Sequence, residues 1–397
     1  MTLTREKLLQ ASALIAASDL DAWCIFVRET AGGSDPVLPF LLEGGLTWNS
    51  ALLIFKNGRR VAVVGNYDAD PLIHSGDWDE VIPYVQGIRE DLLKTLEANL
   101  PAGDRRIGVN FSEDDVKSDG LTHGMYLKLQ SYLAGSRFTL VSAQEVCGAL
   151  RAVKTRTETE RIRRAIAEGD TLFALAAQIA RVGVSEREVY SRIQSEIDAA
   201  GFGYGWDRAG NPIVNSGPDS MIGHGIPSAE ITIQPGHIFH IDLGVVVEGY
   251  SSDIQRCWYV PHPGETELPE DVARALEAVN AAISAGASVM RPGALGHECD
   301  AAARAQLVQR GYPEYMHALG HQVGRQAHDG GAVLGPTWER YGRTPYLPLR
   351  EGEIYTVELG ITVPGRGYLG LEEIVRVTAD GIEWLSERQL SMPFLAG

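Results

Sequence analysis

Residues 237–260 read HIFHIDLGVVVEGYSSDIQRCWYV, and residues 353–378 read EIYTVELGITVPGRGYLGLEEIVRVT. Each stretch contains two runs rich in β-branched and aromatic residues around a short glycine-containing segment, which is the pattern of a β-hairpin. The first turn is expected at Glu248-Gly249 and the second at residues 364–367. Both strands of each hairpin carry a carboxylate, so these segments predict both the fold and the candidate functional residues.

The four carboxylates are placed symmetrically about the two turns. Residues opposite each other in an antiparallel hairpin lie at equal distances from its centre, and they share one face of the sheet. The midpoint of Asp242 and Asp253 falls at the first turn, so these residues should be opposite each other or one step diagonal. The midpoint of Glu358 and Glu372 falls on Gly365, so this pair should be directly opposite.

Two acidic pairs in otherwise apolar strands indicate a bound cation. Like charges that face each other are destabilising unless something positive lies between them. One such pair could equally be an exposed polar face of a hairpin, but two pairs, each centred on its turn, favour a metal site. Histidines at 317, 321 and 328 form a dense cluster, and His224 lies on a loop rich in Gly and Pro. One imidazole with four carboxylates suits a pair of hard or borderline divalent ions, such as Mn²⁺, Co²⁺ or Zn²⁺.

The remaining sequence divides into two parts near residue 150. Residues 1–150 alternate strand-like and helix-like stretches, as an α/β domain does. We expect strands at 23–27, 51–55, 60–64 and 107–110 and a helix at 92–100. Residues 151–397 should form a second domain of the α+β class. Its helices are predicted behind capping boxes at Thr157-x-x-Glu160 and Ser185-x-x-Glu188, and again at 269–290 and 298–310.

Composition excludes several classes of protein. The chain of 397 residues has 35 Lys and Arg against 52 Asp and Glu, a net charge of −17. This balance argues against nucleic-acid or anionic-membrane binding, which needs concentrated positive charge. The four cysteines are too sparse for a disulfide framework, so we expect buried, reduced thiols. Leu8, Ala11 and Ile15 at helical spacing favour an amphipathic first helix over a signal peptide, and a cytoplasmic protein is expected.

The ordered set of Asp242, Asp253, His321, Glu358 and Glu372 resembles the pita-bread metallopeptidases, the superfamily of methionine aminopeptidase, aminopeptidase P and prolidase. The resemblance covers roughly residues 151–390 and rests on fragments such as IDLG, SDIQR and GHQVG. The preceding α/β domain is similar to the creatinase-type N-terminal domain, which favours the proline-directed branch and its bacterial Xaa-Pro dipeptidases. The implied architecture is an α/β creatinase-like domain followed by an α+β pita-bread catalytic domain.

The resemblance also implies roles for individual residues. Asp242 would bind one of two divalent metal ions, and His321 and Glu358 would bind the other. Asp253 and Glu372 would bridge the two ions. A water or hydroxide held between two cations has a lowered pKa and can attack an amide carbonyl.

Three residues are assigned to catalysis by the same resemblance. Glu358 would accept a proton from the attacking water and pass it to the leaving nitrogen. His224 and His328 match two histidines that contact the substrate around the scissile bond. The chain departs from the family at Thr362 and Gly370, where a tyrosine and an arginine are usual. Arginines that could compensate are Arg325, Arg343 and Arg366.

The predicted function is therefore hydrolysis of the Xaa-Pro bond in dipeptides, that is, a prolidase. Aminopeptidase P activity on longer Xaa-Pro peptides is the alternative, and a non-peptidase hydrolase or lyase on the same fold is a more distant one. A non-catalytic binding module is disfavoured because all five ligand positions are intact. The resemblance further implies a homodimer, with Trp48, Tyr67, Trp78 and Tyr84 as candidate contacts, although each is more simply an ordinary core or surface aromatic.

Overall fold

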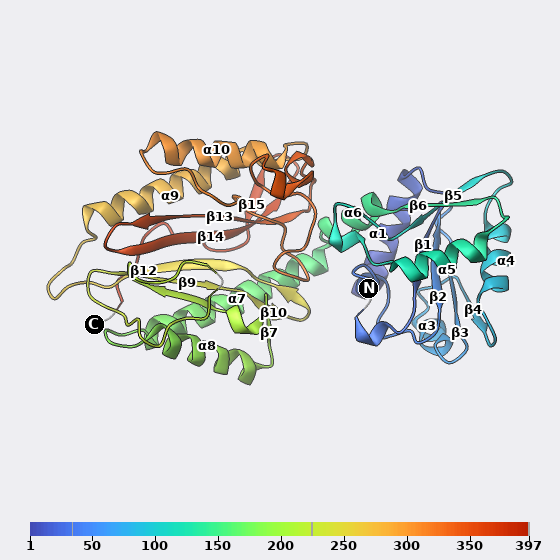
Figure 1. Ribbon diagram of the computed structural model, residues 1–397, viewed down its shortest axis with the longest axis horizontal. Helices are drawn as coiled ribbons and strands as arrows, with labels where there is room; N and C mark the ends of the chain where they lie inside the picture. The colour runs from blue at the N-terminus through green and yellow to red at the C-terminus, as the bar shows by residue number, and fades with distance from the viewer. Residues whose placement is uncertain (34, 224, 396–397) are drawn as a thin grey trace. The chain divides into compact units, whose positions relative to one another are not determined.

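The computed structural model describes residues 1–33, 35–223 and 225–395. The chain separates into two compact units, Met1–Arg151 and Ala152–Gly397, and each is a mixed structure of helices and strands (Figure 1). Within the described residues, no helix combines the length and the apolar composition that crossing a bilayer would require. All four cysteines are free and buried, as expected, and burial raises the pKa of Cys24 to about 12.

A six-stranded mixed sheet forms the centre of the first unit. Its spatial order is β4-β3-β2-β1-β5-β6. The strands β1 to β3 are antiparallel neighbours, whereas β4, β5 and β6 each pair in parallel. The strand bounds are β1 Ala22–Val27, β2 Ser50–Phe55, β3 Arg60–Gly65, β4 Glu80–Tyr84, β5 Arg105–Val109 and β6 Phe138–Ser142. The four strands expected from the sequence are all present, within one or two residues at their ends.

Helices cover both faces of this sheet. Alternate residues of β1 lie in different cores, because successive side chains of a strand point to opposite faces. Trp23 packs with residues of α1 and α6, and Cys24 packs with residues of α4 and α5. Leu8, Ala11 and Ile15 are fully buried, which confirms the amphipathic first helix. The helices are α1 Leu3–Ala17, α2 Leu38–Leu41, α3 Ala69–Ser75, α4 Arg89–Asn99, α5 His123–Leu133 and α6 Gln144–Ala152.

The second unit begins with two capped helices, α7 Arg156–Ile179 and α8 Glu186–Ala200. The box at Ser185 and Glu188 is confirmed, since each side chain bonds the other's backbone N–H. The box predicted at Thr157 and Glu160 is wrong. Thr155 caps α7, with Glu158 as its partner. Both sequence pairs have the same spacing, and the Glu158 side chain is further held inside the protein by the Tyr250 hydroxyl at 2.9 Å.

The main sheet of the second unit contains the long strands of both predicted hairpins. Its spatial order is β13-β14-β12-β9-β8, with β15 paired to β14, and a smaller sheet has the order β11-β10-β7. The strands of the two hairpins are β9 Ile238–Leu243, β10 Val245–Val247, β11 Tyr250–Ser251, β12 Ile254–Tyr259, β13 Ile354–Val363 and β14 Gly367–Val377. The remaining strands are β7 Gly203–Tyr204, β8 Ile213–Ser216 and β15 Ile382–Trp384.

Two further helices, α9 Glu270–Val289 and α10 Gly296–Gln309, pack against each other, and α9 contacts β13 and β14. This contact buries an apolar core that includes Val279, Ile283, Val357 and Leu371. In a strand the neighbours of buried residues face the other way. Packing Val357 and Leu371 against α9 therefore turns the even-numbered residues of β13 and β14, including the two glutamates, to the opposite face of the sheet.

Candidate metal centre

The first hairpin holds its two aspartates in a diagonal arrangement. Asp242 lies opposite Gln255, and Leu243 lies opposite Ile254. The register is therefore shifted by two residues from the directly opposite pairing of Asp242 and Asp253, which leaves the diagonal alternative as the correct one. The turn at Glu248-Gly249 explains the shift, because both residues have positive φ and form a tight two-residue connection centred between them.

The second hairpin confirms its predicted register. Glu358 lies directly opposite Glu372, and the turn follows Val363. Strand β12 then pairs with β14, with Gln255 opposite Glu372. Four neighbouring strands thus present one transverse row of side chains, in the order Asp242, Gln255, Glu372 and Glu358.

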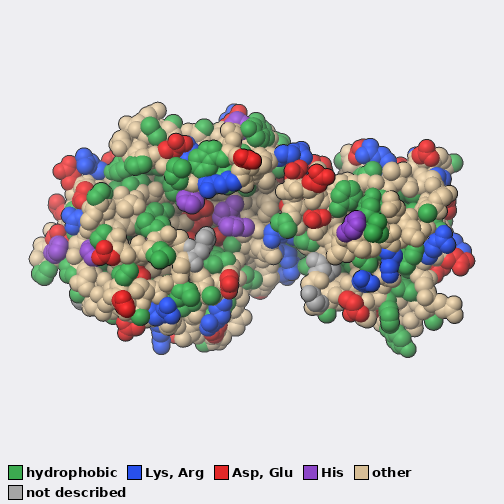
Figure 2. Space-filling view, in the orientation of Figure 1, with side chains coloured by type: hydrophobic (Ala, Val, Ile, Leu, Met, Phe, Trp, Pro, Cys, Tyr) green, Lys and Arg blue, Asp and Glu red, His purple; other side chains and the backbone are tan. Residues whose placement is uncertain are grey.

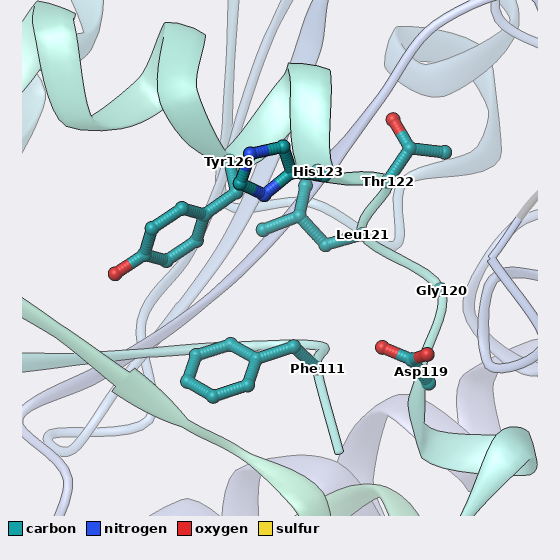
Figure 3. A pocket seen from close by; sticks show the side chains of 7 residues that line it. All are labelled: Phe111, Asp119, Gly120, Leu121, Thr122, His123 and Tyr126. Carbon is teal, nitrogen blue, oxygen red and sulfur yellow. The ribbon is translucent and has the colours of Figure 1, made fainter. Parts of the chain in front are cut away.

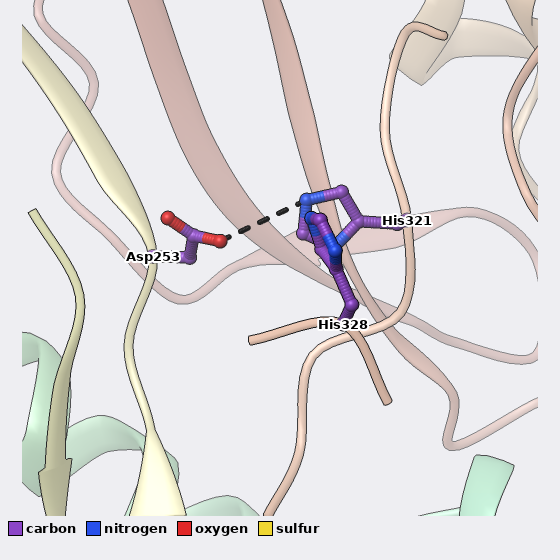
Figure 4. Close-up of side chains that lie close together, drawn as sticks. All are labelled: Asp253, His321 and His328. Atoms are coloured by element: carbon purple, nitrogen blue, oxygen red, sulfur yellow. Dashed lines mark ion pairs between the residues drawn. The ribbon is translucent and has the colours of Figure 1, made fainter. Parts of the chain in front are cut away.

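His321 lies in the segment between α10 and β13. Its backbone is tied to β13 by two hydrogen bonds with Thr356, at 3.2 Å and 2.8 Å. Its Nε2 atom lies 3.7 Å from Asp253 Oδ2, 3.6 Å from Glu358 Oε1 and 3.9 Å from Glu372 Oε1. Figure 4 shows the imidazole pointing at the Asp253 carboxylate. The histidine therefore faces three of the four carboxylates.

The candidate ligand atoms form overlapping groups. Asp242, Asp253 and Glu372 offer atoms within 4.8 Å of one another, and so do His321, Glu358 and Glu372. In the space-filling view, histidine and acidic side chains gather on one face of the second unit (Figure 2). All five residues that the sequence predicts as metal ligands are thus brought together.

Burial strongly perturbs the titration of this cluster. Burial first, and then the neighbouring carboxylates, raise the pKa values of Asp242, Asp253 and Glu358 well above their ordinary range. Burial raises the pKa of Glu372 to about 7 and lowers the pKa of His321 to about 3. A neutral imidazole offers a lone pair, and crowded carboxylates are stable as anions only when cations neutralise them.

Two oxygens in the cluster are short of partners. Asp242 Oδ1 and Glu372 Oε1 are buried, and no described residue donates a hydrogen bond to either atom. Buried carboxylate oxygens are normally satisfied, because an unsatisfied one costs about 1 to 3 kcal/mol or more. A bound divalent cation would satisfy both, so the donor set fits a site for metal ions.

The predicted histidines differ in where they lie. The His328 ring is exposed and meets the His321 ring edge-on, with centroids 4.1 Å apart (Figure 4). His328 therefore borders the cluster on its open side. His317 is not among the grouped ligand atoms within the described residues, and its ring instead lies beside that of Tyr315, with centroids 5.6 Å apart. His224, which was predicted to be catalytic, lies outside the described residues.

Sequence reasoning missed two buried polar residues that lie beside the carboxylates. Gln255 and His240 are buried, and they contact the ligands or one another. Burial lowers the pKa of His240 to about 4, so its ring is neutral. The strand period could have revealed Gln255, because it lies two residues from Asp253 and should share its face.

Two of the three arginines proposed to compensate for the missing tyrosine and arginine contact other groups. Arg366 pairs with Asp271 at 3.2 Å, and the Arg325 guanidinium lies over the Tyr250 ring.

Other hollows offer less chemistry. A pocket of about 520 Å³ in the first unit is lined by two aromatic rings, Phe111 and Tyr126, with the exposed Asp119 at its edge (Figure 3). The Asp119 carboxylate accepts a bond from the Ser112 backbone at 3.3 Å. This pocket thus offers one exposed carboxylate that already accepts a hydrogen bond, whereas the second unit offers a row of buried carboxylates. The second unit therefore holds the candidate site.

Comparison with known proteins identifies the family of the chain. A sequence profile of metallopeptidase family M24 matches residues 160–379, over half of the chain. An Xaa-Pro dipeptidase of Pyrococcus furiosus is 32% identical over 327 residues, which covers 79% of this chain and 87% of the relative. The chain therefore belongs to metallopeptidase family M24, whose members use divalent metal ions.

Solved structures extend the likeness to the whole fold. A dipeptidase of Mycobacterium ulcerans superposes with a TM-score of 0.73 at 24% identity, covering 99% of this chain and 98% of that one. An X-Pro aminopeptidase of Thermotoga maritima gives a TM-score of 0.70 at 23% identity, covering 96% and 99%. The pita-bread fold expected from the sequence is therefore confirmed.

Proposed function

We propose that this protein is a metal-dependent Xaa-Pro dipeptidase. The observation that carries the proposal is the row of carboxylates on β9, β13 and β14, completed by Asp253 and faced by His321. This set lies in a chain whose curated relative at 32% identity is named an Xaa-Pro dipeptidase. Hydrolysis of the Xaa-Pro bond is the activity that the site and the relative jointly support.

Five residues would hold the metal ions: Asp242, Asp253, His321, Glu358 and Glu372. We assign Asp242 to one ion, His321 and Glu358 to the other, and the remaining two as bridging ligands. Two bound divalent ions supply Lewis-acid activation of water and of the scissile carbonyl. The choice among Mn²⁺, Co²⁺ and Zn²⁺ follows availability as much as affinity for such a ligand set.

The proton transfer falls to Glu358. Its carboxyl is half-buried, and burial with the neighbouring carboxylates raises its pKa well above the ordinary range in the metal-free protein. It can take the proton of the attacking water and deliver it to the proline nitrogen, which must be protonated before it leaves. We assign a hydrogen bond to the substrate to His328, whose exposed ring lies beside that of His321. We assign His224 the second substrate contact.

Two further properties belong to the same proposal. We expect a homodimer, as the resemblance implies, and a cytoplasmic setting, with a small Xaa-Pro peptide as substrate and no nucleic-acid or membrane partner. Analytical ultracentrifugation of the purified protein tests the first, and a monomer would contradict it. Fractionation of the source cells tests the second.

The activity is tested by product release from metal-depleted protein after addition of Mn²⁺, Co²⁺ or Zn²⁺. The substrates are an Xaa-Pro dipeptide, an Xaa-Pro-Xaa tripeptide and a matched dipeptide without proline. Metal-dependent cleavage of the first alone supports the proposal. Cleavage of the tripeptide alone would identify an aminopeptidase P, and cleavage of none by metal-loaded protein would point to a non-peptidase hydrolase or lyase.

A further inference from the structure

Gln255 occupies the centre of the carboxylate row. Its backbone pairs with Asp242 on one side and with Glu372 on the other. Its side-chain Nε2 donates to Glu358 Oε2 at 2.8 Å and to Glu372 Oε2 at 3.0 Å. Both protons of one amide group are thus directed at two carboxylates on separate strands.

The two remaining carboxylate oxygens face elsewhere. Glu358 Oε1 and Glu372 Oε1 lie 3.6 Å and 3.9 Å from His321 Nε2. A carboxylate rotates about its terminal bond over a broad range unless a partner fixes it. Gln255 engages the Oε2 atom of each group and leaves the Oε1 atom of each turned toward the imidazole.

A buried imidazole contacts the amide from behind. Gln255 Oε1 lies 3.0 Å from His240 Nε2, and His240 Nδ1 lies 3.1 Å from Asn215 Oδ1. The three residues are 6%, 3% and 4% exposed, so water competes little for these bonds. With the ring proton on Nε2, His240 donates to Gln255 Oε1 and orients the amide with its NH₂ group toward the carboxylates, and Asn215 Oδ1 then receives no proton from the ring.

Gly370 provides the space for this arrangement. A Cβ atom at this position would lie 2.6 Å from Gln255 Oε1, 3.0 Å from His240 Nε2 and 2.5 Å from Tyr368 Cε1. Any side chain there would displace the amide or the rings. The position where the family usually carries an arginine is therefore filled by the side chains of Gln255, His240 and Tyr368.

We propose that Gln255 is a positioning residue that orients Glu358 and Glu372 for metal binding, and that His240 acts through it. The inference rests on the proposed metal centre and adds a neutral amide in the place of a cationic side chain. Groups behind metal ligands fix ligand orientation, and their loss commonly weakens metal affinity about 10- to 100-fold.

The test measures binding of Mn²⁺ to the metal-depleted, full-length protein by titration calorimetry. The variants are Gln255→Leu, His240→Phe, which keeps a ring beside Tyr368, and the two combined. Gln194→Leu is the matched control, because Gln194 is a buried glutamine that bonds only the carbonyls of Arg208 and Asn211 through its amide nitrogen. The visible absorption spectrum of the Co²⁺-loaded protein reports ligand geometry as a second readout.

We expect Gln255→Leu to weaken Mn²⁺ binding about 10- to 100-fold and to alter the Co²⁺ spectrum. His240→Phe alone should weaken Mn²⁺ binding by a smaller factor. In protein that already carries Gln255→Leu it should have no further effect, because the effects of mutations in one hydrogen-bond network do not add. Gln194→Leu should bind as the unaltered protein does. If Gln255→Leu does not fold, Gln255→Met has the same length, lacks a donor and replaces it.

Unchanged Mn²⁺ affinity and spectrum in Gln255→Leu would overturn the inference. So would an equal loss from His240→Phe in both backgrounds, because His240 would then not act through Gln255. The proposed function fails separately: protein that binds Mn²⁺ in the expected pattern but cleaves no Xaa-Pro peptide would leave the positioning role intact.

Discussion

Replacing Glu372 by glutamine should stabilise the metal-free protein while weakening metal binding. Glu372 is 1% exposed, and its ligand atoms lie within 4.8 Å of those of three other carboxylates. Burial raises its pKa from 4.5 to about 7. Each pKa unit corresponds to 1.36 kcal/mol, so holding this carboxylate ionised in the folded, metal-free state costs on the order of 3 kcal/mol.

The pH dependence has a definite sign. Between pH 4.5 and about 7 the folded protein keeps the Glu372 proton, whereas the unfolded chain has released it. Because the folded state binds more protons in this window, its stability falls as the pH rises. Glutamine cannot ionise. The stability advantage of Glu372→Gln should therefore be near zero at pH 4.5 and grow to about 2 to 3 kcal/mol at pH 8.

The assay is urea unfolding in the presence of a chelator at both pH values, followed by a probe in the second unit. Glu373→Gln is the matched control one residue away. Glu373 is equally buried but accepts bonds from Arg256 at 3.1 Å and Ser386 at 2.7 Å. Its replacement leaves the buried Arg256 without its carboxylate partner, although three backbone carbonyls still accept from it, so it should lower the free energy of unfolding by about 3 to 5 kcal/mol.

Without metal, the Glu372→Gln variant should be more stable than the unaltered protein. Added Mn²⁺ should make the unaltered protein the more stable of the two. Ligand binding to the folded state alone stabilises it in proportion to the logarithm of the ion concentration over the dissociation constant. The reasoning is refuted if metal-free Glu372→Gln is no more stable than the unaltered protein at pH 8. An advantage of the same size at pH 4.5 would refute it too.

Three further outcomes follow from the structure. Ser185→Ala removes the side-chain bond to the Glu188 backbone and should lower the free energy of unfolding by about 1 kcal/mol in chemical denaturation. Lys154→Met removes the ion pair with the fully buried Asp329 carboxylate, which lies 3.0 Å from Lys154 Nζ. The free energy of unfolding should fall by about 3 to 5 kcal/mol in the same assay. A chelator should abolish Xaa-Pro hydrolysis, and restored Mn²⁺ should return it; activity that persists through exhaustive chelation would contradict the metal assignment.

Some local features could be predicted from the sequence because short-range chemistry decides them. The register of the second hairpin follows from the turn at residues 364–367, and Ser185 with Glu188 caps its helix through bonds that span three residues. The first hairpin was placed with less accuracy. The turn is centred between Glu248 and Gly249, one residue later than the midpoint of Asp242 and Asp253. This difference moves the residue opposite Asp242 by two positions, from Asp253 to Gln255.

The choice between two equally spaced capping boxes shows where local reasoning ends. Thr155-Glu158 and Thr157-Glu160 have the same residue types in the same order. The protein uses the first, and Glu158 is fully buried against the Tyr250 hydroxyl. That contact joins residues 92 positions apart, so it is invisible in the sequence near the helix.

The sequence by itself determined the candidate metal ligands: four carboxylates in two hairpins and a histidine between them in chain order. Only the tertiary structure decided how they meet. Pairing of β12 with β14 joins Gln255 to Glu372, which are 117 residues apart, and this non-local contact inserts an amide between the two acidic pairs. Backbone turns encode pairing within a hairpin, whereas pairing between hairpins depends on burial of the whole sheet against its helices.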